Sequence, residues 1–239
     1  VDKAGKESDI VVVSIFVNPT QFNNKEDLKR YPRDLNKDLE LLEKTSCRIV
    51  FAPTVEEMYP EEDNRIFNFG DLETVMEGKF RPGHFNGVAQ IVSKLFEAVK
   101  PDKAFFGLKD FQQLAIIRRM TEMLNLNVEI VPCPIIREQS GLAMSSRNML
   151  LSSEERAAAA LISATLFAAV KKSRSFSVGE IKAWVINTIN ANSFLETEYF
   201  EIVDEINLQT VNSWDDKVNK VGCIAVHCGK VRLIDNVKF

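Results

Sequence analysis

The chain has 239 residues, of which 45% are hydrophobic, and its formal net charge at pH 7 is −4. This length and composition allow one large domain or a medium and a small one, and they exclude a disordered tail. Because Lys and Arg form no block interleaved with aromatic residues, and because no apolar run approaches about 18 residues, we expect no nucleic-acid partner, no membrane partner and a cytoplasmic location.

Strands and helices alternate through the first half of the chain. Residues 1–8 have the pattern of the last turns of a helix, and the apolar run 9–17 predicts a strand buried on both faces of a parallel sheet. Helical spacing follows at 34–44, 88–99 and 111–124, with short apolar strands at 48–52, 103–107 and 128–136. This alternation predicts an α/β fold with a doubly wound, Rossmann-like parallel sheet that binds ligands at the carboxyl ends of its strands.

The pattern changes after Asn148, and we place the domain boundary near Ile136. Two capping boxes, Ser152 with Glu155 and Ser177 with Glu180, predict helices at about 153–172 and 178–192. Short strands follow at 198–203, 223–228 and 231–234. We therefore expect a Rossmann-like domain over residues 1–135 and a smaller C-terminal α+β domain over 136–239, which serves as a lid or in oligomerisation.

The cysteines show no CxxC spacing, and the chain has only two histidines. A structural zinc site is therefore not expected, and most of the thiols, which lie in or beside apolar runs, are predicted to be buried. The cysteines are Cys47, Cys133, Cys223 and Cys228.

The segment Phe106-Gly-Leu-Lys-Asp-Phe-Gln-Gln113 lies where a predicted strand ends and a helix begins. Free N–H groups at such a helix start favour an anion, and Lys109 adds a full positive charge. Asp110 either accepts hydrogen bonds from ribose hydroxyls or caps the helix. An ordinary capped helix with a solvent-exposed lysine is the alternative.

A second polar segment, Gly141-Leu-Ala-Met-Ser-Ser-Arg-Asn148, follows the strand predicted at 128–136. An arginine fork, serine hydroxyls and turn N–H groups suit the oxygens of a polyphosphate, and Gly141 lets the backbone come close. The alternative is a solvated turn before a helix.

Two further polar clusters follow or precede apolar runs, at residues 18–22 and 81–85. Gln21 and Gln113 offer neutral donors and acceptors suited to a hydroxy acid. His84 is either a site residue or a turn residue bonded to its own backbone, whereas His227 lies in an apolar strand and is expected to be structural.

Each of these polar clusters lies at a strand end or a helix start of one alternating fold. We therefore expect Gln21, Lys109, Gln113 and Arg147 to surround one cavity. Neither a P-loop nor a complete GxGxxG motif is present, and no GxSxG or Cys–His pair indicates a hydrolase.

In order and spacing, five segments resemble those of the pantothenate synthetase family: residues 13–22, 30–33, 81–85, 106–113 and 144–148. The resemblance extends through essentially the whole chain, to Arg232-Leu-Ile-Asp-Asn236. It implies a nucleotidyltransferase-type fold and a homodimeric ligase. Such an enzyme condenses D-pantoate with β-alanine, using ATP and Mg²⁺, through a pantoyl-adenylate. The alternatives are a nucleotidyltransferase without amide ligation and a non-catalytic nucleotide-binding module.

The resemblance also implies roles for individual residues. Lys109, Arg147 and His84 are expected to be catalytic, Gln21 to bind pantoate and β-alanine, and Gln113 to bind pantoate. Asn18 is expected among the substrate-binding residues, and Tyr31, Arg81 and Asp38 at supporting positions, with Asp38 a possible metal ligand. The expected ATP-binding residues are Gly107, Leu108, Lys109, Asp110, Ile136, Met144, Ser145, Ser146 and Arg147.

The family also has an HxGH-type motif just before the first strand found here, and its second histidine is assigned as a proton donor. The chain begins after that position. We expect further residues upstream, because a sheet without its opening strand would leave residues 11–17 with an unpaired edge. The alternative is a chain without this catalytic group.

Overall fold

The computed structural model describes residues 1–239 except for the side chain of Lys25. The described chain divides into two compact units and passes between them repeatedly. Unit 1 comprises Val1–Gly70, Arg81–Phe106 and Ile116–Cys133; unit 2 comprises Asp71–Phe80, Gly107–Ala115 and Pro134–Phe239. The domain division at residues 135/136 stays a prediction; unit 2 takes in two short segments from the first half of the chain as well as its C-terminal part.

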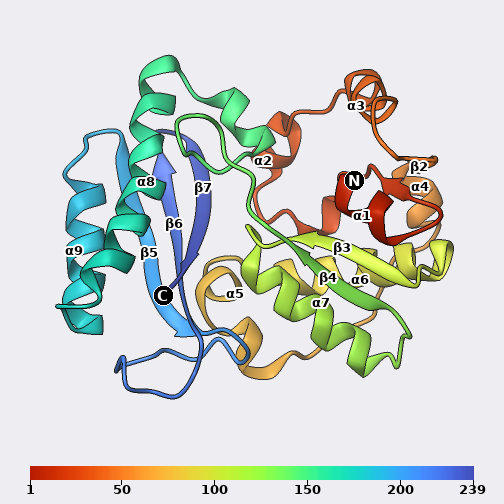
Figure 1. The fold of residues 1–239 in the computed structure, drawn as a ribbon. Helices are drawn as coiled ribbons and strands as arrows, with labels where there is room; N and C mark the ends of the chain where they lie inside the picture. The colour runs from red at the N-terminus through yellow and green to blue at the C-terminus, as the bar shows by residue number, and fades with distance from the viewer. The chain divides into compact units, whose positions relative to one another are not determined.

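Unit 1 alternates short strands with helices (Figure 1). β1 (Val12–Ser14) pairs in parallel with β2 (Ile49–Phe51), and β3 (Lys103–Gly107) pairs with β4 (Glu129–Cys133). The connecting helical elements are α1 (Asp2–Glu7), η1 (Pro19–Gln21), α2 (Lys25–Arg30), α3 (Leu35–Leu42), α4 (Val55–Met58), α6 (His84–Val99) and α7 (Phe111–Met123), of which α7 begins in unit 2.

Several predicted boundaries in unit 1 differ from those observed. The strand predicted at 9–17 pairs only over Val12–Ser14, matching the short β2, and the side chains of these three residues are half-buried or exposed. The prediction of a strand buried on both faces is therefore wrong. The helix predicted at 88–99 begins earlier, because Gly83 adopts a left-handed φ of 79° and turns the chain into α6 at His84.

Unit 2 is built on an antiparallel sheet in the order β5 (Leu195–Asp204), β6 (Lys220–Cys228), β7 (Val231–Lys238). Helices α8 (Ser153–Lys172) and α9 (Val178–Asn190) lie alongside this sheet (Figure 1). They bury an apolar core that includes Ile162, Leu166, Ile181, Phe200 and Ile224. The remaining elements are η2 (Gly70–Glu73), whose first residue closes a unit 1 segment, α5 (Met76–Phe80) and η3 (Ser146–Leu150).

Both predicted capping boxes are present and begin the helices of unit 2. The Ser152 hydroxyl accepts from the Glu155 N–H at 3.2 Å, and the Glu155 carboxylate accepts from the Ser152 N–H at 2.8 Å. Ser177 and Glu180 make the same reciprocal pair at 3.3 and 2.8 Å. These local bonds satisfy N–H groups that a helix start leaves unpaired, so the predicted starts are confirmed.

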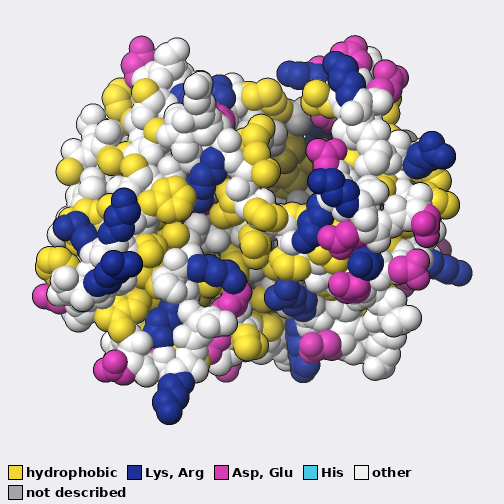
Figure 2. Space-filling model, in the orientation of Figure 1, with side chains coloured by type: hydrophobic (Ala, Val, Ile, Leu, Met, Phe, Trp, Pro, Cys, Tyr) yellow, Lys and Arg dark blue, Asp and Glu magenta, His cyan; other side chains and the backbone are white. Residues whose placement is uncertain are grey.

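The surface carries charges of both signs, and fewer thiols are buried than the sequence predicted. Basic and acidic side chains are interspersed over the face seen in Figure 2. Cys223 and Cys228 are buried and Cys47 and Cys133 half-buried, all as free thiols. Burial raises the pKa of the Cys228 thiol to about 11, which keeps it protonated and unreactive. In the part of the chain that the structure describes, no helix combines the length and apolar character needed to cross a bilayer.

Candidate active site

The turn at residues 107–110, between β3 and α7, carries the first set of predicted phosphate-binding residues. Gly107 and Asp110 are exposed, and Leu108 and Lys109 are half-buried. A Cβ added at Gly107 would meet no atom within 4 Å, so open space adjoins the turn. The turn therefore presents accessible backbone at the start of a helix, where free N–H groups and the helix dipole favour an anion.

Asn236 of β7 holds this turn from the side of the sheet. Its Nδ2 donates to the carbonyl oxygens of Leu108 at 2.8 Å and Lys109 at 3.1 Å. The side chain is buried, so both amide hydrogens are used within the protein. The strand-end position of Lys109 was predictable, but the residue that fixes it was not.

The second set of predicted residues begins on a hairpin over residues 136–144. The Met144 N–H donates to the Ile136 carbonyl at 2.9 Å, and Gly141 closes the turn with a left-handed φ of 91°. Ile136 and Met144, expected beside adenine and phosphate, are thereby paired, with 64% and 56% of their surfaces exposed. Two adjacent exposed apolar side chains suit the flat face of a base.

The helical turn η3 follows the hairpin and carries the serines and Arg147. The Ser145 hydroxyl caps it by accepting from the Arg147 N–H at 3.3 Å. Asn148 is buried, and its Nδ2 donates to the Glu138 carboxylate at 2.7 Å and the Ala143 carbonyl at 3.0 Å. The Asn148 amide nitrogen therefore fastens η3 to the hairpin and is not available to a phosphate.

Arg137 ties the hairpin to the sheet. Its guanidinium makes a two-pronged ion pair with Asp235 of β7, at 2.6 and 2.9 Å, and donates to the Gly141 carbonyl at 3.1 Å. Asp235 is next to Asn236, so neighbouring residues of one strand hold both segments of predicted ATP-binding residues. These segments lie together in unit 2.

Gln112 and Gln113 sit side by side in the first turn of α7 but have different surroundings. Gln112 is buried; its amide nitrogen donates to the carbonyls of Leu72 and Val75, and its oxygen accepts from the Glu77 N–H at 2.9 Å. Gln113 is half-buried. Gln112 therefore holds the segment before α5, whereas Gln113 keeps its predicted role as a substrate contact.

In unit 1, Asn18 is a structural centre. Its Nδ2 donates to the Gly87 carbonyl at 3.0 Å, while its oxygen accepts from the hydroxyls of Thr20 at 3.1 Å and Tyr59 at 2.8 Å. The side chain is only 2% exposed. We infer that Asn18 supports the substrate residues by shaping η1, because its polar atoms are already engaged.

Gln21, Arg81 and His84 are brought together in unit 1. The Gln21 carbonyl accepts from Arg81 Nη2 at 3.3 Å and lies 2.9 Å from His84 Nδ1. His84 is buried in the first turn of α6. The alternative that His84 bonds only its own local turn is wrong, since it reaches a residue 63 positions away.

The remaining supporting positions lie on the surface of unit 1. Tyr31 is half-buried, with its ring at an edge-on angle to Phe22, 5.6 Å between centroids. Asp38 is exposed on α3. Within the described residues, no three His, Cys, Asp or Glu side chains lie close enough to hold a metal ion.

Comparison with known proteins assigns the chain to a family. The family model described as pantoate-beta-alanine ligase matches residues 1–238. The chain belongs to the pantoate–β-alanine ligase family. A pantothenate synthetase from Phocaeicola vulgatus is 58% identical over 240 residues, covering 100% of this chain and 85% of that protein. One from Porphyromonas gingivalis is 54% identical over 239 residues, with the same coverage.

Solved structures agree. The crystal structure of pantothenate synthetase from Thermus thermophilus matches with a TM-score of 0.94 and 41% identity, covering 99% of this chain and 86% of that one. Pantoate–β-alanine ligase from Francisella tularensis, complexed with beta-gamma ATP and beta-alanine, matches with a TM-score of 0.79 and 33% identity, covering 99% and 82%. The α/β fold class, the family resemblance and the ligase class of enzyme are thus confirmed. The individual roles of the site residues stay predictions.

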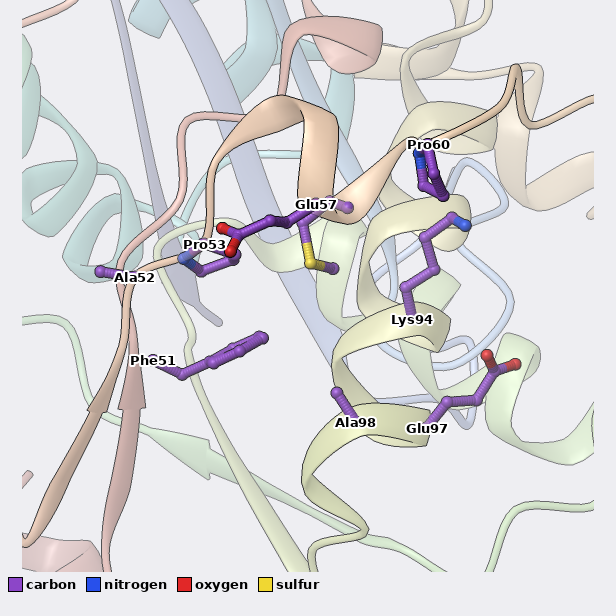
Figure 3. A pocket seen from close by; sticks show the side chains of 9 residues that line it. Phe51, Ala52, Pro53, Glu57, Pro60, Lys94, Glu97 and Ala98 are labelled. Atoms are coloured by element: carbon purple, nitrogen blue, oxygen red, sulfur yellow. The ribbon is translucent and has the colours of Figure 1, made fainter.

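Unit 1 of this ligase also has an open pocket of about 620 Å³, and none of the predicted site residues lines it. The end of β2 and α4 form one side of it, and Lys94, Glu97 and Ala98 of α6 form the other (Figure 3). Lys94 lies 3.7 Å from Asp63 and 5.4 Å from the centre of the Tyr59 ring, so its charge is already balanced within the unit.

A buried polar network in unit 2 consists of residues to which no role was assigned from the sequence. Arg232 of β7 donates to the Glu77 carboxylate of α5 at 2.6 and 2.9 Å and to Glu198 of β5 at 2.6 Å. The Tyr199 hydroxyl donates to Glu77 at 2.8 Å. Burial, followed by the charge of Glu77, raises the Tyr199 pKa well above its usual value. The network anchors α5, which immediately precedes Arg81.

Proposed function

We propose that this chain condenses D-pantoate with β-alanine, using ATP, to give pantothenate, AMP and diphosphate. Membership of the family and the five motifs support this reaction. The structural observation that best supports this reaction is that two adjacent residues of β7 hold both segments of predicted ATP-binding residues. Asn236 binds the 107–110 turn, and Asp235 binds the 136–144 hairpin, which η3 follows. A helix start next to a lysine suits the polyphosphate of ATP, and an exposed pair of apolar side chains suits its base.

The first step forms pantoyl-adenylate. A carboxylate oxygen of pantoate attacks the α-phosphorus of ATP, and the bond from that phosphorus to diphosphate breaks. Because this brings one anion onto another, cationic groups must offset the growing charge. Lys109 and Arg147 are suited to that role, and Gln113 to binding the hydroxy acid.

The second step forms the amide. The β-alanine amine attacks the acyl carbon, the bond to AMP breaks, and the nitrogen loses a proton. Most of the acceleration comes from holding the reactants in line, so a covalent enzyme intermediate is not required. Gln21 contacts pantoate and then β-alanine, with its backbone held by Arg81 and His84.

We assign Mg²⁺ to the substrate as MgATP. Magnesium commonly binds through phosphate oxygens, waters and one or two carboxylates rather than in an all-protein cage. Among the described residues no His, Cys, Asp and Glu cluster competes with this assignment. Asp38, exposed on α3, is the carboxylate to test as an additional ligand.

We place the reaction in the cytoplasm, where ATP is available, and propose that the protein is a homodimer. The segment before η2 supports the latter, because Ile66 is 89% exposed although the next residue, Phe67, is buried. An apolar side chain exposed to this extent is a candidate contact for a second copy.

The reaction is tested by supplying MgATP and pantoate with and without β-alanine and following AMP and amide product by mass spectrometry. We expect pantoate-dependent exchange of labelled diphosphate into ATP without β-alanine, and equal amounts of AMP and pantothenate with it. AMP without any amide product would favour the nucleotidyltransferase alternative. The absence of both exchange and product would favour a non-catalytic nucleotide-binding module.

A further inference from the structure

We propose that Asp235 and Asn236 are positioning residues for the adenylation step, holding the two nucleotide-binding segments of unit 2 at a fixed spacing. This inference deepens the proposed function and rests on it. The first segment is the 107–110 turn, and the second is the 136–144 hairpin together with η3.

Asn236 controls the turn that carries Lys109. Its Nδ2 donates to two successive carbonyls, those of Leu108 and Lys109, and its side chain is among the buried polar groups of unit 2. Two bonds to consecutive peptide groups fix the orientation of the backbone from which the Lys109 side chain projects. A leucine of similar size would leave both carbonyls without this partner, and an aspartate would place oxygen against oxygen.

Asp235 controls the hairpin. Both of its carboxylate oxygens accept from Arg137, and the same guanidinium donates to the Gly141 carbonyl in the hairpin turn. Asp235 is only 4% exposed, so the bond geometry is protected from water. A planar, bidentate pair restricts direction as well as distance, which a lysine in place of Arg137 would not do.

The alternation of side chains along a strand explains how one strand can hold both segments. Leu233, on the same face of β7 as Asp235, belongs to the apolar core that contains Leu142 of the hairpin. Ile234, on the same face as Asn236, packs against the cluster that also contacts Leu108. The two segments therefore lie against opposite faces of the sheet, and β7 sets the distance between them.

Such spacing matters because misplacing reacting groups by about 1 Å can cost on the order of 100-fold in rate. Neither Asp235 nor Asn236 needs to touch a substrate for this effect. Their contribution passes through the Lys109 backbone in one case and through the hairpin in the other.

The test for Asn236 compares Asn236→Ala, Lys109→Ala and the double variant in pantoate-dependent diphosphate exchange. We expect Asn236→Ala to lower the rate at saturating substrate at least about tenfold with the KM for pantoate unchanged. If Asn236 acts through Lys109, the double variant is no slower than Lys109→Ala, because the shared effect is counted once. Losses that multiply, or a rate within about twofold of wild type, would overturn the proposal.

Two further variants keep this test informative. Asn190→Ala removes another asparagine hydrogen bond of unit 2, in which the Asn190 side-chain oxygen accepts from the Thr197 N–H at 2.8 Å, and is expected to leave exchange unchanged. If Asn236→Ala does not fold, Asn236→Ser, which keeps one donor, takes its place with a smaller expected loss. A serine variant that folds and exchanges at the wild-type rate would overturn the role of Asn236.

The test for Asp235 uses Arg137→Lys, which keeps the charge and loses the fork. We expect a KM for ATP raised at least about tenfold with the KM for pantoate unchanged. A change in melting temperature alone would show that the ion pair is only structural. If wild-type protein shows no exchange, the proposed function fails. Calorimetric titration of ATP then tests the positioning role separately, and we expect weaker ATP binding in both the Arg137 and Asn236 variants. Unchanged ATP binding would overturn the positioning role.

Discussion

Lys109 and Arg147 are the cationic side chains proposed to meet the phosphates of ATP. We expect Lys109→Ala and Arg147→Ala each to lower the adenylation rate about 100-fold, because each removes a charge directed at the transition state. Diphosphate exchange measures this directly. Lys182→Ala, which removes a lysine paired with Glu201 elsewhere in unit 2, is the matched control. Unchanged exchange in both site variants would refute their role.

Alanine substitution of Gln113 should affect substrate binding, whereas alanine substitution of Gln112 should affect stability. Gln113→Ala is expected to raise the KM for pantoate while ATP binding stays intact, because an amide suited to a hydroxy acid is lost. Gln112→Ala is expected to lower the free energy of unfolding by about 2 kcal/mol, since the carbonyls of Leu72 and Val75 and the buried Glu77 N–H lose their partner. Urea unfolding and calorimetric titration separate the two. Equal losses of ATP and pantoate affinity in Gln113→Ala would contradict its assignment.

Asp63 gives unit 1 a pH-dependent contribution to stability. Hydrogen bonds from Arg65 lower the pKa of this carboxyl from 3.8 to about 2, and its side chain is 5% exposed. Because the folded pKa is depressed, the stabilisation is present above about pH 4 and is lost as the pH falls toward 2. We expect Asp63→Asn to cost about 1 to 2 kcal/mol at pH 7, with the difference from wild type vanishing near pH 2. A difference in urea unfolding that is constant from pH 7 to 2 would contradict this cause.

At the residue scale, the sequence reveals groups whose chemistry and position coincide. Lys109 follows a strand that ends in glycine, so an anion-binding role could be inferred from local pattern alone. Asn236 offers no such signal, because an asparagine within an apolar strand has many possible partners and its partners are more than 120 positions away. Asn148 shows the opposite failure, since a polar residue in a promising motif proved to be buried in the fold.

At the scale of elements, the contact between η1 and α6 depends on a glycine. A Cβ added at Gly87 would lie 2.6 Å from the Thr20 carbonyl oxygen and 2.9 Å from the Gln21 nitrogen, both backbone atoms. We expect Gly87→Ala to lower the free energy of unfolding by about 1 to 3 kcal/mol and to raise the KM for pantoate by moving Gln21.

Gly179→Ala is the matched control, because the added methyl group in α9 meets nothing within 4 Å. That variant should gain about 0.5 to 1 kcal/mol from the better helix propensity of alanine. Both values can be read from urea unfolding. A Gly87 variant as stable as wild type, with unchanged pantoate kinetics, would show that η1 can move without consequence.

The elements best predicted from sequence are those with local causes. α8 and α9 begin where their capping boxes place them, since the bonds involved span only three residues. β1 was predicted too long because its length depends on β2, which pairs over Ile49–Phe51. α5 was not predicted at all: its five residues are held by Gln112 and Arg232 from distant parts of the chain.

At the scale of the whole molecule, the proposed dimer can be measured by light scattering after gel filtration. We expect a mass of about twice the 27.0 kDa of one chain. Ile66→Glu should shift it toward a single chain, because a charge at a buried contact is costly. Ile206→Glu, at a side chain 81% exposed in unit 2, is the control and should remain dimeric. A wild-type mass of one chain would contradict the dimer, and a dimeric Ile66 variant would contradict the contact.

The fold class was easier to predict from the sequence than the division of the chain into two units. Alternation of strands and helices predicted the α/β class, and the pattern after Asn148 predicted two helices followed by short strands, whose antiparallel pairing was not predicted. The inclusion of residues 71–80 and 107–115 in unit 2 could not be predicted, because it depends on contacts with β7 and its neighbours. A common cavity for Gln21 and Lys109, which belong to different units, stays a prediction.

The pairing of Glu77 with Arg232 also has a consequence for biosynthesis. Arg232 follows Glu77 by 155 residues. At about 5 to 20 residues per second, the ribosome needs roughly 8 to 30 seconds to deliver that arginine. Until then the nascent Glu77 has no guanidinium to neutralise it, and a carboxylate resists leaving water unpaired. Helix α5 therefore reaches its final place only after Arg232 has been translated.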